Sequence, residues 1–375
     1  MKRLGIFVFY DQEGIVDKYV EVLLETMLQE LKKLVIVVNG NINESSKQRM
    51  LNYSENIFVR ENKGYDGGAY KDVFLNYLVD ENWENWDEVV LFNDTFFGPL
   101  FSWKNVFGKM ESEDLDFWGL TRHPGGGKMP LSTNEIPSHL QGYFLVCKKN
   151  LVLSEAFYQF WESLEYPQSY NEAVENFEIR FTTYFHEAGF QSKSYIDVCN
   201  YSENIKYKEN PYLLKSYELV KDVHFPVVKK KALFAPFFLP SLKILEYIES
   251  NTAYDVDLIN QHLNRLYRVN NVFIFKSREV LEFCEKHNRV YIYGHGEYAK
   301  NLNEYFEYKS LKHDGYIVTK KDETDTDVYE YADIHLEPRD GVILALGKRA
   351  CSEVFPVIKE KVPREHLLLL YDIEK

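Results

Sequence analysis

The sequence predicts an α/β protein in three parts. These are a mostly parallel sheet with helices on both faces, a helical connector, and a small Rossmann-like α/β unit. Apolar runs typical of buried strands alternate with runs of helical spacing through the first 200 residues, and this alternation returns near residue 288. The length of 375 residues also exceeds that of one ordinary domain. We therefore expect boundaries that give parts 1–200, 201–287 and 288–375.

The first part shows the strand and helix signals in regular order. Expected strands are 4–10, 34–38, 57–59, 89–92 and 117–120, with a further strand at 143–147. Expected helices are 20–31, 45–51, 73–78, 151–164 and 172–188, the last closed by Gly189. Strands that alternate with helices in this way pair in parallel, because each helix carries the chain back across the sheet.

The remaining two parts have different patterns of expected secondary structure. The segment 201–287 reads mostly as helix, and its breaks are Pro211, Pro226, Pro236 and Pro240. After it, "RVYIYGHGEYAKNLNEYF" predicts a strand, a glycine turn and a helix, and "HDGYIVT" and "GVILALG" predict two more strands. This pattern is typical of a small Rossmann-like unit.

Composition excludes some classes of protein. The net charge is −14, and the only tight basic run is 229–231, so we expect no nucleic-acid partner. The four cysteines are too widely spaced for a zinc site and fit a reducing compartment. The apolar run 4–10 is too short for the core of a signal peptide, so we expect a cytoplasmic protein.

The stretch "RENKGYDGGAYKDVF", residues 60–74, follows an expected strand and opens a helix. It lacks the Gly-Lys-Ser/Thr of a phosphate-binding P-loop and the dinucleotide fingerprint. Glycines let a backbone approach a ligand closely, and Asp66 is able to accept a hydrogen bond from a ribose or a base. The alternative is that Asp66 caps the helix, but a cap leaves Gly67 and Gly68 unexplained.

The stretch "DEVVLFNDTFFGPLF" ends a buried strand in Asn93 and Asp94. Ligands of open α/β sheets sit at the carboxyl ends of strands, where a carboxylate is able to hold a divalent cation and its diphosphate. The alternative is an Asx turn that ends the strand. Residues 114–116 spell Asp-x-Asp but precede their strand, so we interpret them as a decoy.

Two further stretches carry candidates for chemistry. In "HLQGYFLV", His139, Gln141 and Tyr143 follow a Gly/Pro-rich loop, 124–137, which we expect to be a mobile flap; a structural histidine is the alternative. In "VENFEIRFTTYFHEAGF", Glu178 is a candidate general base near a helix start. Taken alone, the residues favour the alternative that Glu178 only complements the helix dipole.

The C-terminal "YGHGEYAK" holds Gly294 and Gly296 without the rest of a dinucleotide fingerprint. An NAD(P)-dependent enzyme is therefore a weak rival hypothesis.

Several of these stretches together resemble a known family. "ENKGYDGGAYKDVF", "VVLFNDTFFGPL", "DFWGLT", "HLQGYFLV" and "FEIRFTTYFHEAGF" occur in the order and spacing of the rhamnan synthesis protein F family of bacterial glycosyltransferases. "NPYLLKSYELV", "HFPVVKKKALF" and "TAYDVDLINQHL" extend the resemblance to about residue 260. The resemblance implies a GT-A-type fold and transfer of L-rhamnose from dTDP-L-rhamnose, that is, a hexosyltransferase and specifically a rhamnosyltransferase.

The resemblance also implies roles for individual residues. Donor contacts fall to Asn62, Gly64, Tyr65, Asp66, Gly67, Gly68, Asn93 and Asp94. Asp94 stands in for Asp-x-Asp beside a Mg²⁺ or Mn²⁺ ion, and His139, Gln141 and Tyr143 form a loop at the donor and acceptor. Glu178 takes the place of the catalytic base of inverting relatives, against the dipole interpretation.

The implied partners are a nucleotide-sugar donor and a glycan or lipid-linked glycan acceptor of the cell wall or O-antigen. The tract 229–240 combines lysines with aromatic residues, so it predicts either a peripheral contact with the inner face of the membrane or a connector packed into the core. The rival function is a non-catalytic glycan-assembly or nucleotide-sensing protein that keeps the transferase fold.

Overall fold

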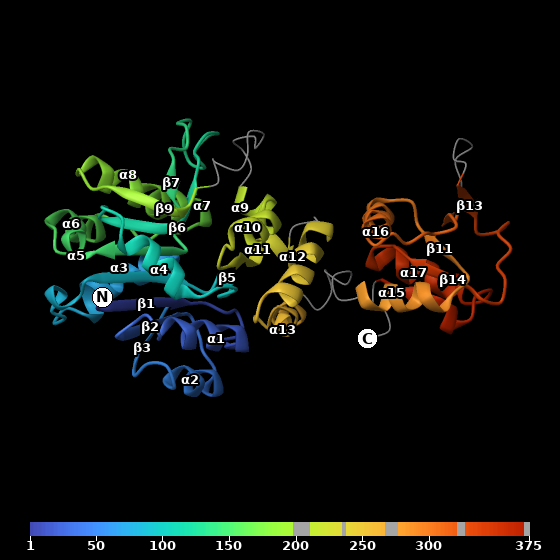
Figure 1. Ribbon diagram of the computed structural model, residues 1–375, viewed down its shortest axis with the longest axis horizontal. Helices are drawn as coiled ribbons and strands as arrows, with labels where there is room; N and C mark the ends of the chain where they lie inside the picture. Colours follow the sequence, from blue (N-terminus) through green and yellow to red (C-terminus); the bar gives the residue numbers. More distant parts are fainter. Residues whose placement is uncertain (198–210, 235–237, 267–276, 321–326, 371–375) are drawn as a thin grey trace. The chain divides into compact units, whose positions relative to one another are not determined.

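The computed structural model describes residues 1–197, 211–234, 238–266, 277–320 and 327–370 (Figure 1). The chain forms two compact units: one comprises Met1–Ala232 and Ile244–Ile259, the other Leu233–Lys243 and Asn260–Lys375. The expected connector thus contributes residues to both units. Among the described residues, no helix is both long enough and apolar enough to cross a membrane.

The larger unit is built on one eight-stranded sheet with the order β3-β2-β1-β4-β8-β6-β7, and β9 pairs with β6. Its strands are β1 (Arg3–Phe9), β2 (Lys33–Asn39), β3 (Asn56–Arg60), β4 (Glu88–Asn93), β6 (Phe117–His123), β7 (His139–Leu140), β8 (Phe144–Lys148) and β9 (Ser192–Ile196). Strands β1 to β4 pair in parallel, and β6 pairs in parallel with β9. Strand β8 is antiparallel to both β4 and β6.

The order of the first four strands places a switch point between β1 and β4. The chain winds from β1 outward to β3 and then returns to the other side of β1 as β4. At such a point the loops at the carboxyl ends of the strands diverge and leave room for a ligand. The residues that follow β3 and β4 are therefore brought to the same edge of the sheet.

Helices cover both faces of this sheet. They are α1 (Lys18–Met27), α2 (Glu44–Leu51), α3 (Tyr65–Asp72), α4 (Trp103–Glu111), α5 (Lys149–Val152), α6 (Glu155–Ser163), α7 (Tyr170–Glu172) and α8 (Arg180–Glu187). Two π-helical segments continue helices, η1 (Val73–Tyr77) after α3 and η3 (Ala173–Ile179) between α7 and α8, and η2 (Trp83–Asn85) is a 3₁₀ turn. Figure 1 shows α5, α6 and α8 gathered on the same side of the unit.

The core explains why these segments form strands and helices. Every residue of β1 and β4 is buried, as continuous apolar runs in a covered parallel sheet require. One face packs on aromatic side chains of α6, η3 and α8, including Trp161, Phe177 and Phe181. On the opposite face, Trp103 of α4 stacks on Phe144 with ring centroids 5.3 Å apart.

The connector is mainly helical, as the sequence predicts, but it also holds a short strand. Its helices are α9 (Pro211–Leu214), α10 (Ser216–Val223), α11 (Lys230–Phe234), α12 (Phe238–Asn251), α13 (Val256–Leu266) and α15 (Ser277–Lys286). Strand β10 (Val228–Lys229) pairs antiparallel with β5 (Phe96–Phe97) directly after β4. Pro236 lies outside the described residues.

The smaller unit contains a five-stranded parallel sheet with the order β13-β12-β11-β14-β15. The strands are β11 (Arg289–Tyr293), β12 (Tyr316–Val318), β13 (Val328–Glu330), β14 (Asp340–Leu344) and β15 (Leu367–Leu369), with helices α16 (Glu297–Tyr308) and α17 (Lys348–Ile358) and the turn η5 (Arg364–His366). Figure 1 shows α15, α16 and α17 around these strands. The predicted Rossmann-like arrangement is confirmed.

The expected α/β fold class is confirmed for the chain. All expected strands of the first part are present, and 143–147 corresponds to β8 with a shift of one residue. Strand β9 and the short strands β5, β7 and β10 are not predicted by the sequence, because two to five residues without apolar alternation carry little signal. The three-part division at 200 and 287 stays a prediction.

Candidate functional site

The predicted residues of β4 lie at the carboxyl edge of the sheet. Asn93 is the last residue of β4, and Asp94 follows it. The Oδ1 atom of Asn93 accepts hydrogen bonds from the backbone N–H of Thr95 at 3.0 Å and from its hydroxyl at 2.7 Å. The Asx turn, the alternative for this stretch, is therefore present. It leaves the Asn93 amide nitrogen free to reach another element.

Asn93 connects β4 to the start of α3. Its Nδ2 atom donates a hydrogen bond of 2.6 Å to Oδ2 of Asp66. Burial raises the pKa of Asp66 to about 6; the bond from Asn93 opposes this rise and the charges of Asp94 and Glu178 add to it. The alternative that Asp66 caps α3 is wrong, because the N-cap is Gly64 and the Asp66 carboxylate turns to Asn93.

The glycines of this stretch have a packing role that the sequence analysis did not identify. A Cβ atom on Gly67 would lie 2.8 Å from Cγ of Phe177, and one on Gly68 would lie 2.6 Å from the Lys63 carbonyl oxygen. Gly64 has φ +80°, and a Cβ there would lie 2.8 Å from Tyr166. Packing therefore requires glycine at these positions on the side that a Cβ would occupy, and their contact with a donor stays a prediction. The space is filled by other side chains and backbone.

Two of the predicted donor contacts lie on the surface. Asn62 is exposed, and Tyr65 is 38% exposed. Tyr65 also has φ +53°, a backbone conformation that non-glycine residues rarely adopt. Such local strain is concentrated at functional sites. The strain directs attention to Tyr65 as a residue with a role beyond packing.

Asp94 is buried and already has partners. The Lys230 ammonium lies 2.9 Å from its Oδ2 atom, and the Tyr19 hydroxyl donates a hydrogen bond of 3.1 Å to the same oxygen. Only 7% of Asp94 is exposed. The carboxylate therefore sits in an ion pair rather than facing open solvent.

The β5–β10 pairing brings Lys229 to the same place. Its Nζ atom lies 3.6 Å from the centroid of the Tyr143 ring. Burial lowers the pKa of Lys229 to about 8, and the negative charges of Glu178 and Asp66 oppose this lowering. From the sequence, the lysine tract predicts either a membrane contact or a connector packed into the core, and the partly buried Lys229 favours the second alternative. Nothing in the sequence signals that a two-residue strand pairs with Phe96 and Phe97, about 130 residues earlier in the chain.

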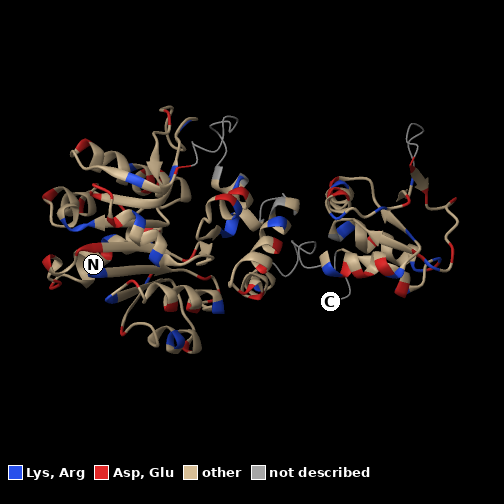
Figure 2. Ribbon diagram, in the orientation of Figure 1, with Lys and Arg blue, Asp and Glu red and all other residues tan. Residues whose placement is uncertain are grey.

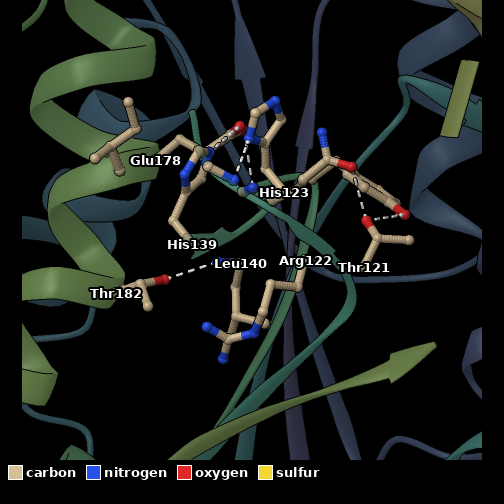
Figure 3. Close-up of polar contacts among 12 residues, drawn as sticks. Thr121, Arg122, His123, His139, Leu140, Glu178 and Thr182 are labelled. Atoms are coloured by element: carbon tan, nitrogen blue, oxygen red, sulfur yellow. Dashed lines mark hydrogen bonds and ion pairs between the residues drawn. The ribbon is translucent and has the colours of Figure 1, made fainter. Parts of the chain in front are cut away.

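Glu178 lies within the π-helical segment η3 and reaches the turn between β7 and β8. Its Oε2 atom accepts a hydrogen bond of 2.9 Å from the Gly142 backbone N–H. Its Oε1 atom lies 3.5 Å from Nε2 of His139 (Figure 3). The dipole alternative is wrong, because the helical path begins at Tyr170 and Glu178 is far beyond its first turn.

The electrostatics of Glu178 favour its ionised form. Burial raises its pKa, but the hydrogen bond and charge of His139, the Gly142 N–H and the charge of Lys229 outweigh burial and leave the pKa below its ordinary value. A quarter of the side chain is exposed. Glu178 is therefore a charged carboxylate with access to solvent. π-Helical segments are often found at functional sites.

His139 is held from both sides. Its Nδ1 atom donates a hydrogen bond of 2.8 Å to the Pro137 carbonyl, so Nε2 faces Glu178. The His123 ring stacks on it at 5.0 Å, as Figure 3 shows. Burial and the charge of His139 lower the pKa of His123 to about 4. His123, which the sequence analysis did not select, is thus neutral beside the pair.

Gln141 and Tyr143 are buried and meet at Thr121. The Thr121 hydroxyl lies 2.9 Å from Oε1 of Gln141 and 2.9 Å from the Tyr143 hydroxyl (Figure 3). These bonds fix the turn that carries Gly142. Both buried side chains therefore hold this turn in place and do not face an open space.

The expected flap at 124–137 forms a hairpin. The Met129 backbone N–H donates to the Asn134 carbonyl at 2.8 Å, and Gly126 and Ile136 pair in the same way. Its mobility stays a prediction. In the Asp-x-Asp of 114–116, Asp116 accepts a hydrogen bond of 2.7 Å from the Gln191 backbone N–H, and the interpretation of this triplet as a decoy stays a prediction.

The residues around Asp94 do not fit the expected divalent cation. Within the described part of the chain, no group of three or more His, Cys, Asp and Glu side chains is arranged to hold a metal ion. At Asp94 itself an ammonium group occupies the position next to the carboxylate oxygen. A cation at Asp94 would have to displace Lys230, because like charges repel strongly in a partly buried site.

Charges of both signs are spread over the described elements of each unit (Figure 2). The cluster at the edge of the large sheet differs from this background because its charges are partly or fully buried. It contains the acids Asp66, Asp94 and Glu178 and the bases Lys229, Lys230 and His139. We call these six residues the charged cluster.

Three comparisons place the chain among known proteins. The model of a protein family described as Rhamnan synthesis protein F matches residues 34–369. A curated relative is an uncharacterized protein, y4gN, of Sinorhizobium fredii, which is 24% identical over 187 residues. The match covers 50% of this chain and 46% of that protein. The chain thus spans about half the length of the curated relatives it matches.

Solved structures are similar only at a low level. One is 4-diphosphocytidyl-2C-methyl-D-erythritol synthase from Anaerococcus prevotii, with TM-score 0.34, 11% identity, and coverage of 52% of this chain and 87% of that one. Another is Core-mannan synthase A from Aspergillus fumigatus in its Mn/GDP form, with TM-score 0.26, 8% identity, and coverage of 46% and 68%. TM-scores this low support no conclusion about the chemistry of this chain.

Proposed function

Because the chain belongs to the rhamnan synthesis protein F family, we propose that it is a glycosyltransferase of GT-A type. It moves a sugar, L-rhamnose from dTDP-L-rhamnose, onto a growing cell-surface polysaccharide or lipid-linked glycan. The observation that carries the proposal is the ionised, solvent-accessible Glu178 held between Gly142 and His139 at the carboxyl edge of the sheet.

The proposed reaction is a single displacement. Glu178 accepts the proton of an acceptor hydroxyl, and the oxygen forms a bond to the anomeric carbon of the donor sugar. The bond between that carbon and the phosphate oxygen breaks, and its electron pair leaves with the nucleoside diphosphate. The lowered pKa of Glu178 keeps the base ionised at neutral pH, and the Gly142 N–H fixes its orientation.

The start of α3 forms the nucleoside side of the proposed site. Asp66 presents a carboxylate that Asn93 holds in place, and a ribose hydroxyl is a suitable donor to it. The strained and exposed Tyr65 offers an aromatic face on which a base is able to stack. Asn62 lies on the surface of the preceding loop and remains a proposed contact.

A location at the inner face of the cell membrane remains part of the proposal, but the lysines do not support it. Lys229 and Lys230 are partly buried in the charged cluster, whereas the third lysine, Lys231, is exposed. Of the aromatic half of the tract, residues 235–237 lie outside the described residues. The lipid-linked acceptor is thus proposed from the family alone.

The test is binding and turnover with a panel of nucleotide sugars. We expect dTDP-L-rhamnose to raise the melting temperature of the full chain, and dTDP to be released when a membrane extract of glycan acceptors is added. Binding without release would favour the non-catalytic alternative. Stabilisation by NAD(P) and by none of the nucleotide sugars would overturn the proposal.

A further inference from the structure

Two adjacent lysines are fixed at the carboxyl end of β4 by backbone pairing. Val228 pairs with Phe97 and Lys229 pairs with Phe96 in the β5–β10 ribbon. The Lys230 backbone N–H donates a hydrogen bond of 3.0 Å to the Thr95 carbonyl. These bonds fix the backbone positions of Lys229 and Lys230. Their ammonium groups therefore belong to the site and not to a mobile surface tract.

Lys229 is a partly buried cation without a bonded anion. In the part of the chain that the structure describes, its ammonium contacts the face of Tyr143 at 3.6 Å and makes no hydrogen bond or ion pair. Burial disfavours the charged form, which lowers the pKa to about 8. Removing a charge from water without a partner costs free energy, and an anionic ligand would remove that cost.

Lys230 makes the nearby carboxylate unsuitable as a metal ligand. Its ammonium is 2.9 Å from Asp94 and 4.7 Å from the centroid of the Tyr19 ring. An ammonium has three donors, and Asp94 is the one side-chain anion bonded to it in the described residues. Lys230 therefore retains donors for a second anion, while Asp94 holds it in position.

We propose that Lys229 and Lys230 bind the diphosphate of the nucleotide sugar and take the place of a divalent cation, with Asp94 as the residue that positions Lys230. The inference rests on the proposed function and concerns the same site. As the bond from the anomeric carbon to the phosphate oxygen breaks, its electron pair stays on the diphosphate. The two ammonium groups stabilise that charge by hydrogen bonds, and the acceptor's proton goes to Glu178.

The first experiment measures binding of dTDP, UDP and GDP to the full chain by calorimetry, once with EDTA and once with Mn²⁺. We expect at least one of these diphosphates to bind with EDTA present, and Mn²⁺ to change its dissociation constant by less than about threefold. The affinity should fall as salt concentration rises, because the contacts are between charges.

The second experiment compares variants under the EDTA condition. Lys229→Met and Lys230→Met should each weaken binding by about tenfold or more, the usual loss of a charged hydrogen bond. Lys231→Met is the matched control, because Lys231 is exposed and bonds to the Tyr170 hydroxyl at 3.0 Å. Its affinity should stay within about threefold of that of the unchanged protein.

Two further measurements distinguish diphosphate binding by the lysines from binding through a metal ion on Asp94. They are the melting temperature of Lys229→Met and the binding of the diphosphate by Asp94→Asn. Lys229→Met should melt at or above the temperature of the unchanged protein, because it removes a costly buried charge. Asp94→Asn should still bind the diphosphate with EDTA present, since the carboxylate only positions Lys230.

Binding that requires Mn²⁺ and is lost in Asp94→Asn would overturn the inference and leave the proposed function standing. Binding that is unaffected by both lysine substitutions would also overturn it. If none of the diphosphates binds under either condition, the proposed function itself fails.

Discussion

The Nε2 atom of His139 lies 3.5 Å from the Oε1 atom of Glu178, and the Nδ1 atom of the same ring is bonded to the Pro137 carbonyl. The ring therefore connects the base of the long hairpin to the Glu178 carboxylate of the charged cluster. The hydrogen bond and charge of His139 lower the pKa of Glu178 and so favour the ionised carboxylate. His139 is thus a positioning residue for Glu178.

The first prediction concerns Glu178→Gln. The amide cannot accept a proton from the acceptor hydroxyl, so we expect the transfer rate to fall by about 10²-fold to 10⁴-fold. The Gln oxygen is still able to accept the bond from Gly142, so donor binding should be unchanged. Release of nucleoside diphosphate measures the transfer rate, and calorimetric titration with the donor measures donor binding.

The matched control is Glu187→Gln, because Glu187 is an exposed acid near the end of α8. It should leave both rate and affinity unchanged. Transfer by Glu178→Gln at close to the rate of the control would show that another group is the base.

The second prediction concerns the pH dependence of transfer in His139→Ala. Glu178 faces His139, Lys229 and the neutral His123, and it also feels the charge of Asp66. The substitution removes the hydrogen bond and charge of His139, two of the causes that lower the pKa of Glu178, so this pKa should rise. The acidic limb of the profile of kcat/KM should move to higher pH, because the base is ionised only above its pKa.

If His139→Ala only disturbed folding, the rate would fall at every pH and the acidic limb of the kcat/KM profile would stay at the same pH. That outcome would remove His139 from its positioning role. His186→Ala is a suitable control, since its exposed ring bonds to Ser192 and not to Glu178.

The third prediction links Asp66 to stability. Folding raises the pKa of Asp66 from 3.8 to about 6, so the folded chain binds this proton more tightly than the unfolded chain. The stabilisation is complete below the unfolded pKa and is lost as pH rises through about 6. Asp66→Asn should therefore be more stable than the unchanged protein by about 1–2 kcal/mol near neutral pH, after a discount for partial exposure.

Urea unfolding at several pH values provides the measurement. The difference in unfolding free energy should shrink toward zero as pH falls below the unfolded pKa of 3.8, because Asp66 is then protonated in both states. The same substitution should weaken donor binding if Asp66 contacts the ribose. A less stable Asp66→Asn at neutral pH would contradict the electrostatic account.

The fourth prediction separates two reasons for a glycine. Gly67→Ala places a Cβ 2.8 Å from Cγ and 2.9 Å from Cβ of Phe177, and these atoms lie too close to the backbone to move aside. We expect a loss of about 1–3 kcal/mol in unfolding free energy from this clash. Thermal or urea unfolding measures it.

Gly108→Ala is the control, because it is also a helical glycine and a Cβ there meets nothing within 4 Å. It should gain about 0.5–1 kcal/mol from the higher helix propensity of alanine. Equal stability of the two variants would mean that α3 does not pack on η3 as closely as the structure shows.

The sequence predicted most of the large sheet because β1, β2 and β4 are continuous apolar runs that only a covered parallel sheet explains. It also selected Asn93 and Asp66 from their places after strands, and the structure joins them by a hydrogen bond. It did not predict the packing role of the glycines, because the packing partners Phe177 and Tyr166 lie about a hundred residues away along the chain. A local sequence pattern does not indicate packing partners that are so distant along the chain.

By itself the sequence determined the α/β fold class, the Rossmann-like C-terminal unit and the family to which the chain belongs. Only the tertiary structure decided the charged cluster. A two-residue ribbon brings Lys229 and Lys230 to Asp94, and a π-helical segment turns Glu178 toward His139. The physical reason is that apolar periodicity is set by nearest neighbours on one strand or helix, whereas the charges that perturb one another come from segments joined only by folding.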